Sequence, residues 1–234
     1  MTWLSRFLGG QDASSRGLTA RQAQSIAGWR HLPEPDPHRS HYRCRYVVVD
    51  VAATGSDVNV DRLRSIGAVA VVDGQIDFKD ALQLAVADLA PARASPPAAG
   101  EEEGGRTATV DALIAFLGFV GKGRLVAYNA PFVERMIERA LDESLGIRLG
   151  LQWMDLAWVL PDLWRQVDAG QGRLDAWLDH FGIDSMQRHD ALSDAFATAQ
   201  LLQVTLAQAL RKGFETSASL AALEKARRHM HQSG

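Results

Sequence analysis

The sequence has little of the features that mark secreted, membrane or strongly basic proteins. Its 234 residues contain one cysteine, Cys44, which excludes an internal disulfide and is typical of a reducing compartment. No apolar run is long enough to span a membrane, and the apolar part of residues 1–8 is too short for a secretory signal. We therefore expect a cytoplasmic globular protein with no membrane partner.

Charge and local motifs exclude further classes of protein. The formal net charge of −3 gives no general attraction to nucleic acid, although it allows a local basic groove. The sequence has no glycine-rich phosphate loop and no zinc-ligand pattern. Hydrophobic residues make up 47% and charged residues 23%, which is ordinary for a soluble protein with one substantial core.

We predict three parts along the chain. They are a helical and proline-rich extension, a compact domain and a basic tail helix, over residues 1–43, 44–212 and 213–234. In the extension, a helical stretch over residues 18–29 is followed by Pro33, Pro35 and Pro37, which end it.

Three strands are predicted to open the compact domain. The first ends near Ala52, and the second covers residues 65–72. Asp73 and Gly74 are a strong hairpin signal, so the third strand is expected over residues 75–86. These strands should form an antiparallel meander.

The remaining elements predict an α/β fold. Residues 88–107 are rich in Ala, Pro, Gly and Glu, which predicts a mobile loop. A short strand at residues 124–128 should lead into a helix that Asn129 or a neighbour caps and Pro131 opens. Helical spacing over residues 110–117 predicts a helix, and further helices are expected around residues 154–166, 173–181 and 190–212. This order favours a mixed sheet flanked by helices.

The most informative stretch is the first strand. Its near-continuous apolar run ends in Asp50 and is followed by Thr54 and Gly55, which predicts a buried central strand that carries a carboxylate to a sheet edge. Side chains alternate along a strand, so Asp50 and Ala52 point to the same face. A metal-dependent phosphodiesterase would use carboxylates at both positions.

Three separate stretches together resemble one family. They are the strand with Asp50, Thr54 and Gly55, the junction at residues 128–132, and the segment at residues 189–195. They resemble the DEDDh 3′–5′ exonucleases of the proofreading-subunit type, over about residues 44–210. The resemblance implies a ribonuclease-H-like fold and two divalent metals, Mg²⁺ or Mn²⁺, which hold the scissile phosphate and the attacking water.

The resemblance also implies roles for individual residues. By position, Asp50 corresponds to the first metal-binding aspartate, Asp194 to the last, and His189 to the general base. For His189 the alternative is a histidine at a helix entry without a chemical role. The residues expected to line the substrate cleft are Thr54, Gly55, Asn129 and Phe132.

Two departures from the family pattern weaken the implied metal site. Ala52 stands at the position of the family's glutamate, and Val133 at that of its second aspartate. Only Asp50 and Asp194 remain of the acidic set, so the carboxylate charge that faces the metals is halved. Magnesium needs oxygen ligands in strict geometry, so we expect weak binding of one ion or none.

Neighbouring acids are weak candidates to replace the missing ligands. Glu134 lies one helical step from Val133, which turns it by about 100° away from the inward stripe. Asp57 and Asp61 lie on the loop after the first strand, and Asp190 is expected to cap the helix that follows. The simpler interpretation of each is a solvated or capping acid.

Two groups of side chains are expected to have structural roles. Four tryptophans have a helical spacing that favours core packing or a hydrophobic interface over base stacking, and they lie at residues 153, 158, 164 and 177. Arg227 and Arg228 are able to contact phosphate, but a solvated tail helix is the simpler expectation.

Three functional hypotheses remain open. The first is a protein that binds a DNA or RNA 3′ end or a nucleoside monophosphate, with impaired or absent hydrolysis. The second is an active metal-dependent 3′–5′ exonuclease, similar to the epsilon subunit of DNA polymerase III, that uses Asp50, Asp194, His189 and a substitute ligand. The third is a non-catalytic scaffold that binds a protein partner through residues 1–40.

Overall fold

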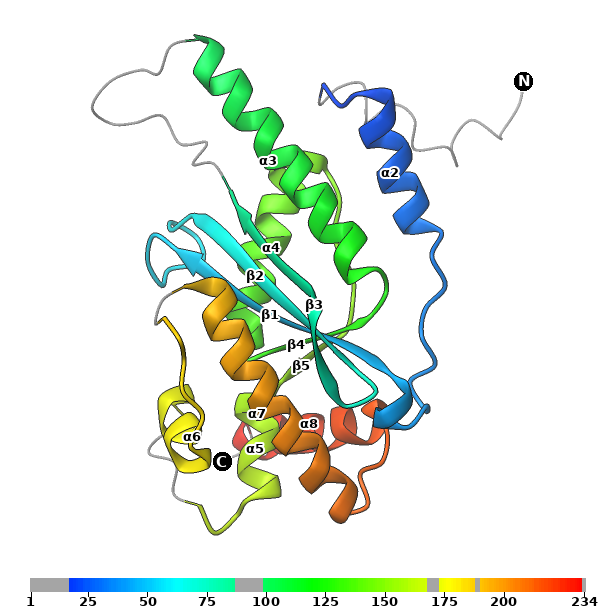
Figure 1. Ribbon diagram of the computed structural model, residues 1–234, viewed down its shortest axis with the longest axis vertical. Coiled ribbons are helices and arrows are strands. Elements are labelled where there is room, and N and C mark those ends of the chain that lie inside the picture. The colour runs from blue at the N-terminus through cyan, green and yellow to red at the C-terminus, as the bar shows by residue number, and fades with distance from the viewer. Residues whose placement is uncertain (1–16, 87–98, 168–172, 188–189, 233–234) are drawn as a thin grey trace.

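A five-stranded mixed sheet forms the centre of the protein in the computed structural model (Figure 1). The structure describes residues 17–86, 99–167, 173–187 and 190–232, and it describes the side chains of all of these except 99–103 and 232. The strands are β1 (Arg45–Ala53), β2 (Leu63–Val72), β3 (Gln75–Ala85), β4 (Arg124–Ala127) and β5 (Trp153–Asp155). Their order across the sheet is β3-β2-β1-β4-β5.

Helices cover both faces of this sheet (Figure 1). They are α2 (Ala20–Arg30), α3 (Ala99–Val120), α4 (Ala130–Leu145), α5 (Leu156–Leu163), α6 (Leu174–Phe181), α7 (Ala191–Arg211) and α8 (Ser217–Gln232). A short 3₁₀ turn at His41–Arg43 precedes β1. Among the described residues, no helix is long and apolar enough to cross a membrane.

The strand pairing confirms the predicted fold class. β1, β2 and β3 pair as an antiparallel meander, and β1, β4 and β5 pair in parallel. The turn between β2 and β3 contains Asp73 and Gly74, both with positive φ angles of 52° and 79°, as this type of hairpin requires. β5 has three residues, which is too short to give a strand signal in the sequence.

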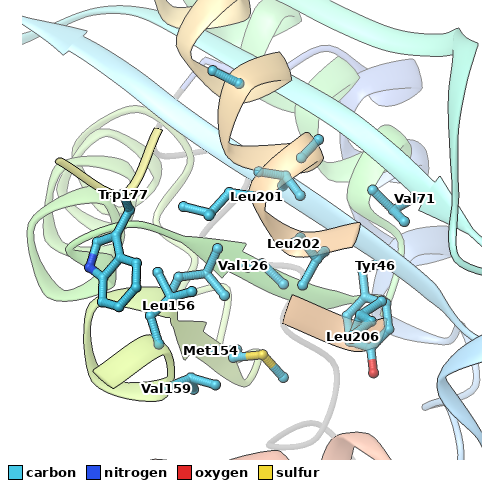
Figure 2. Close-up of a cluster of buried hydrophobic side chains, with 14 of the residues drawn as sticks. Tyr46, Val71, Val126, Met154, Leu156, Val159, Trp177, Leu201, Leu202 and Leu206 are labelled. Carbon is cyan, nitrogen blue, oxygen red and sulfur yellow. The ribbon is translucent and has the colours of Figure 1, made fainter. Parts of the chain in front are cut away.

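The alternation along β1 divides the core into two clusters. Tyr46 and Val48 belong to the cluster on the α7 side, and Val47 and Val49 belong to the cluster on the side of α3 and α4. Figure 2 shows Tyr46 with other side chains of the first cluster, including three leucines of α7 at residues 201, 202 and 206. Burial on both faces explains why β1 has an almost continuous apolar sequence.

The predicted loop over residues 88–107 is wrong in its second part. α3 begins at Ala99 and has 22 residues, so residues 99–107 are helical, whereas residues 87–98 lie outside the described part of the chain. The helix buries Leu113, Phe116 and Leu117 against the sheet. Tertiary packing of such a face stabilises a helix beyond what its local sequence propensity predicts.

The segments before and after the sheet both contact the rest of the protein. In α2, Ile26 and Trp29 are buried, and the Trp29 indole N–H donates to the carbonyl oxygen of Gly121 at 2.6 Å. In α8, Leu220 is fully buried in the cluster on the α7 side. The division of the chain at residues 43 and 212 stays a prediction.

Candidate functional site

Asp50 lies near the carboxyl end of the central strand β1. Its side chain is on the face of Tyr46 and Val48, because residues two apart on a strand share a face. The Asp50 Oδ1 atom accepts a hydrogen bond from the backbone N–H of Val51 at 2.8 Å. The negative charge of Asp194, on α7, acts on Asp50 electrostatically. The two predicted metal ligands are therefore within electrostatic reach of each other.

A glycine on the neighbouring strand β2 allows the start of α7 to pack closely against the sheet beside Asp50. Gly67 on β2 pairs with Asp50, and a Cβ atom at Gly67 would lie less than 3.0 Å from backbone atoms of Ala191, the first residue of α7. Any other residue at this position would displace the start of α7. No local sequence pattern identifies the role of Gly67, because this role depends on a contact between distant segments.

The start of α7 is fixed by a capping aspartate. Asp190 is the N-cap, and its side chain accepts a hydrogen bond from the backbone N–H of Ser193 at 2.9 Å. Its second oxygen accepts from Gln83 Nε2 of β3 at 2.8 Å. The expected capping role of Asp190 is confirmed, and the cap is not available as a metal ligand in this arrangement.

The electrostatics of the pair favour partial protonation in the absence of metal. Burial, together with the nearby charge of Asp194, raises the pKa of Asp50 to about 7, although the hydrogen bond from Val51 opposes this. Asp194 Oδ1 accepts a hydrogen bond from the Ser185 hydroxyl at 3.0 Å. A divalent cation between the two carboxylates would relieve their repulsion. His189 lies outside the described residues, so its catalytic role stays a prediction.

Hydrocarbon side chains occupy both positions at which the resemblance implies an acid. Val133 on α4 has 1% of its surface exposed and belongs to the cluster with Met136 and Ile137. Ala52 is half-buried on β1, on the same face as Asp50. Neither side chain has an oxygen, and among the described residues no three His, Cys, Asp or Glu side chains are placed to hold a metal ion.

The loop after β1 uses its acids internally. Asp61 Oδ1 accepts from the Thr54 hydroxyl and its Oδ2 accepts from the backbone N–H of Asp57, both at 2.8 Å. A Cβ atom at Gly55 would lie less than 3.0 Å from the Asp61 carboxylate, so a larger residue there would displace the Asp61 side chain from these hydrogen bonds. Arg139 of α4 donates to two backbone carbonyls, of Asp61 and a loop neighbour. These bonds favour a structural role for Thr54, Gly55 and Asp61.

The junction between β4 and α4 has an unusual backbone. Asn129 is the N-cap of α4 with φ 60°, and its side chain makes no capping hydrogen bond. Instead its backbone N–H donates to Asp155 Oδ1 at 2.9 Å. Asparagine tolerates this left-handed conformation better than most residues. Phe132, one turn later, is half-buried beside the cluster on the side of α3 and α4. Tyr128 lies against the cluster on the α7 side.

Sequence reasoning missed a second group of charged residues at the sheet edge. Asp155, at the end of β5, is 1% exposed, and its Oδ2 accepts from Arg228 Nη2 at 3.2 Å. Glu224 of α8 accepts from the backbone N–H of Asp155 at 3.2 Å and from Arg228 Nε at 2.9 Å. Burial raises the pKa of both acids above its ordinary value, and the charge of Arg228 opposes this shift only in part. The expectation that Arg228 belongs to a solvated tail is therefore wrong, because it binds two buried acids.

Comparisons with known proteins agree with this architecture. The RNase_T exonuclease family matches residues 47–202, which is more than half of the chain. The chain therefore belongs to this exonuclease family. The expected relationship to DEDDh 3′–5′ exonucleases, with a ribonuclease-H-like fold, is confirmed.

Two relatives are much longer proteins, and the match covers only a part of each. The PolC-type DNA polymerase III of Thermotoga petrophila is 29% identical over 164 residues, which cover 67% of this chain and 11% of that protein. The same enzyme of Clostridium perfringens is 29% identical over 178 residues, which cover 71% of this chain and 11% of that protein. The chain thus spans about a tenth of the length of these polymerases.

Solved structures show the same fold at lower identity. E. coli exonuclease I in complex with a dA16 oligonucleotide has a TM-score of 0.55 and 18% identity, over 72% of this chain and 42% of that one. The nuclease domain of 3′hExo, a DEDDh family member bound to rAMP, has a TM-score of 0.52 and 15% identity, over 76% of this chain and 97% of that domain.

Proposed function

We propose that the chain binds the 3′ end of a nucleic-acid strand, or a nucleoside monophosphate, with little or no hydrolysis. Asp50 and Asp194 hold one divalent ion, Mg²⁺ or Mn²⁺, and the phosphate of the ligand completes its coordination. Solved relatives of the same fold contain an oligonucleotide in one case and rAMP in another, which supports nucleic acid as the class of ligand.

The observation that carries the proposal is the burial of Val133. This side chain fills a space among aliphatic residues and supplies no oxygen at the position where the resemblance implies an acid. Ala52 leaves the neighbouring position without a ligand as well. Phosphodiester hydrolysis by two metals depends on clamping both the attacking and the leaving oxygen. Two remaining carboxylates suit one ion better than two.

The remaining pair fits a single hard cation. Two carboxylates, waters and a phosphate oxygen are able to supply the six oxygen ligands that Mg²⁺ prefers. When bound, the ion supplies Lewis-acid polarisation of the phosphate. The raised pKa of Asp50 means that metal binding displaces a proton at neutral pH, so metal affinity should rise with pH through about 7.

The direct test is digestion of a single-stranded oligonucleotide labelled at its 5′ end. Purified protein with Mg²⁺ or Mn²⁺ should release 3′ nucleotides at a rate near that of the buffer. Asp194→Asn is the matched control, because it removes a ligand and keeps the shape of the side chain. Robust 3′ digestion that disappears in this variant would support the active exonuclease instead.

Binding is tested by calorimetry with manganese and thymidine monophosphate. Each ligand should tighten binding of the other by the same factor, because the ion and the phosphate contact each other. Asp50→Asn should abolish this linkage. Nucleotide binding that is independent of manganese and unchanged in Asp50→Asn would place the ligand elsewhere and contradict the proposal.

A further inference from the structure

A cavity of about 890 Å³ lies at the carboxyl ends of β4 and β5, which is the same end of the sheet as Asp50, because β1, β4 and β5 are parallel. Residues of α5, α6 and α8 line it, together with Tyr128 and Asn129 at the end of β4. β4 is the neighbour of β1, which carries Asp50, and neighbouring strands are roughly 4.8 Å apart. Ligands commonly bind outside the carboxyl ends of parallel strands, and small-molecule sites have volumes of roughly 300–1,000 Å³.

Two arginines of α8 form one side of this cavity. Arg227 Nη1 contacts Asp162 Oδ1 at 2.7 Å, and Arg228 contacts Asp155 and Glu224. The arginine side chains are 23% and 32% exposed, whereas the three acids are 2–11% exposed. The carboxylates therefore hold the guanidinium groups from the buried side. Each guanidinium has five N–H donors, so donors remain on the side that faces the cavity.

Flat aromatic groups form another side. Arg228 lies over the Trp158 ring, with its Cζ atom 5.0 Å from the ring centroid. His231 meets the same ring edge-on at 5.3 Å, and Tyr128 and Trp177 also line the cavity. Aromatic rings and guanidinium planes are the groups on which nucleobases stack in single-strand-binding proteins.

We propose that this cavity binds a second nucleotide of a single strand whose 3′ end lies at the carboxylate pair. The base stacks on the wall around Trp158, and the phosphate contacts Arg227 and Arg228. Arg173, at the rim, has 77% of its side chain exposed and lies 3.8 Å from the Asp175 carboxylate, and its exposed guanidinium group is a third contact for the phosphate. This inference rests on the proposed function and extends it, because it makes the ligand an oligonucleotide rather than a mononucleotide.

The experiment compares a mononucleotide with an oligonucleotide on the full chain. Affinity for a 5′-fluorescein oligothymidylate is measured by anisotropy with manganese over a range of salt concentrations, and affinity for thymidine monophosphate by calorimetry. The variants are Arg227→Gln and Arg173→Gln. Arg21→Gln is the matched control, because Arg21 is an exposed arginine on α2, which packs on α3 away from α8 (Figure 1).

Each cavity variant should weaken oligonucleotide binding by about five- to tenfold, as the loss of a charged hydrogen bond to phosphate implies. Each should also reduce the slope of log affinity against log salt by about one. Binding of thymidine monophosphate should stay within about twofold, because a mononucleotide at the metal does not reach α8. Arg21→Gln should change none of these quantities. Thermal melting checks that each variant is folded. If Arg227→Gln is destabilised, the result for Arg173→Gln decides the question, because Arg173 is largely exposed.

The outcomes separate this inference from the proposed function. If thymidine monophosphate binds with manganese but all the variants bind the oligonucleotide with equal affinity and salt dependence, the cavity is not a nucleotide site and the proposed function stands. If neither ligand binds under any condition, the proposed function fails and the cavity proposal fails with it.

Discussion

Replacement of Asp50 by asparagine is expected to stabilise the metal-free protein at neutral pH. The carboxyl group is held beside Asp194 in a partly buried position, and its pKa is raised from an ordinary 3.8 to about 7. Asparagine keeps the oxygen that accepts the hydrogen bond from Val51 but carries no charge. The variant therefore removes the repulsion and the desolvation of the charged form, and it leaves the shape of the site intact.

The magnitude follows from the difference in pKa between the folded and the unfolded state. A shift from 3.8 to about 7 corresponds to a destabilisation of up to about 4 kcal/mol, at about 1.36 kcal/mol for each pKa unit. Because Asp50 is not completely buried, solvent screening reduces this figure, and we expect about 2 kcal/mol. The folded state holds the extra proton, so the free energy of unfolding falls as pH rises between 3.8 and 7 and is level above 7.

Urea unfolding at a series of pH values, with a chelator present, measures this effect. At pH 8 the free energy of unfolding of the variant should be larger than that of the unsubstituted protein by about 2 kcal/mol. This difference should vanish near pH 3. Asp194→Asn serves as a comparison, because it removes only the neighbouring charge and should lower the pKa of Asp50 by part of the shift. Unfolding curves for Asp50→Asn that run parallel to those of the natural protein at every pH would refute the reasoning.

Two further variants test how the site is built. Gly67→Ala should destabilise the protein by about 1–3 kcal/mol, as overpacking does, and should weaken manganese binding, because the new Cβ pushes α7 and Asp194 away from Asp50. Unchanged urea midpoint and metal affinity would contradict this. The double change Ala52→Glu with Val133→Asp should lower the stability of the metal-free protein and make it rise with added manganese. The control Ala53→Glu with Val133→Asp places the new glutamate on the opposite face, so an equal response to manganese in both would show that the glutamate at position 52 does not reach the ion.

Local signals explain the parts of the fold that the sequence predicts. The first three strands follow from alternation and apolar runs, and the turn between β2 and β3 follows from the Asp73–Gly74 pair. Asp190 is recognisable as a cap because it directly precedes a helical pattern. The start of α3 is not recognisable from the sequence, because the residues before Val110 have weak helix propensity. They join the helix through the packing of its later turns.

Contacts between distant segments explain what the sequence does not predict. The role of Gly67 depends on Ala191, and the Asp155 carboxylate meets Arg228, which is 73 residues away along the chain. No local pattern identifies such partners. The proximity of Asp50 and Asp194 is predictable only through the family resemblance, because their separation along the chain gives no indication of contact.

If Ala52 and Val133 stand where the resemblance implies acids, their hydrocarbon side chains have a consequence for the metal-free state. Two carboxylates already raise the pKa of Asp50 to about 7, and two more at positions 52 and 133 would add like charge in the same region. Val133 instead contributes apolar contacts to the α4 cluster, where a buried unpaired carboxylate would be strongly destabilising. We therefore expect the chain to fold without a metal at this site, whereas a full acidic set would make stability depend on bound ions. This dependence is what the double variant with Ala52→Glu and Val133→Asp should introduce, so the metal response of its stability reports on the site independently of any hydrolysis.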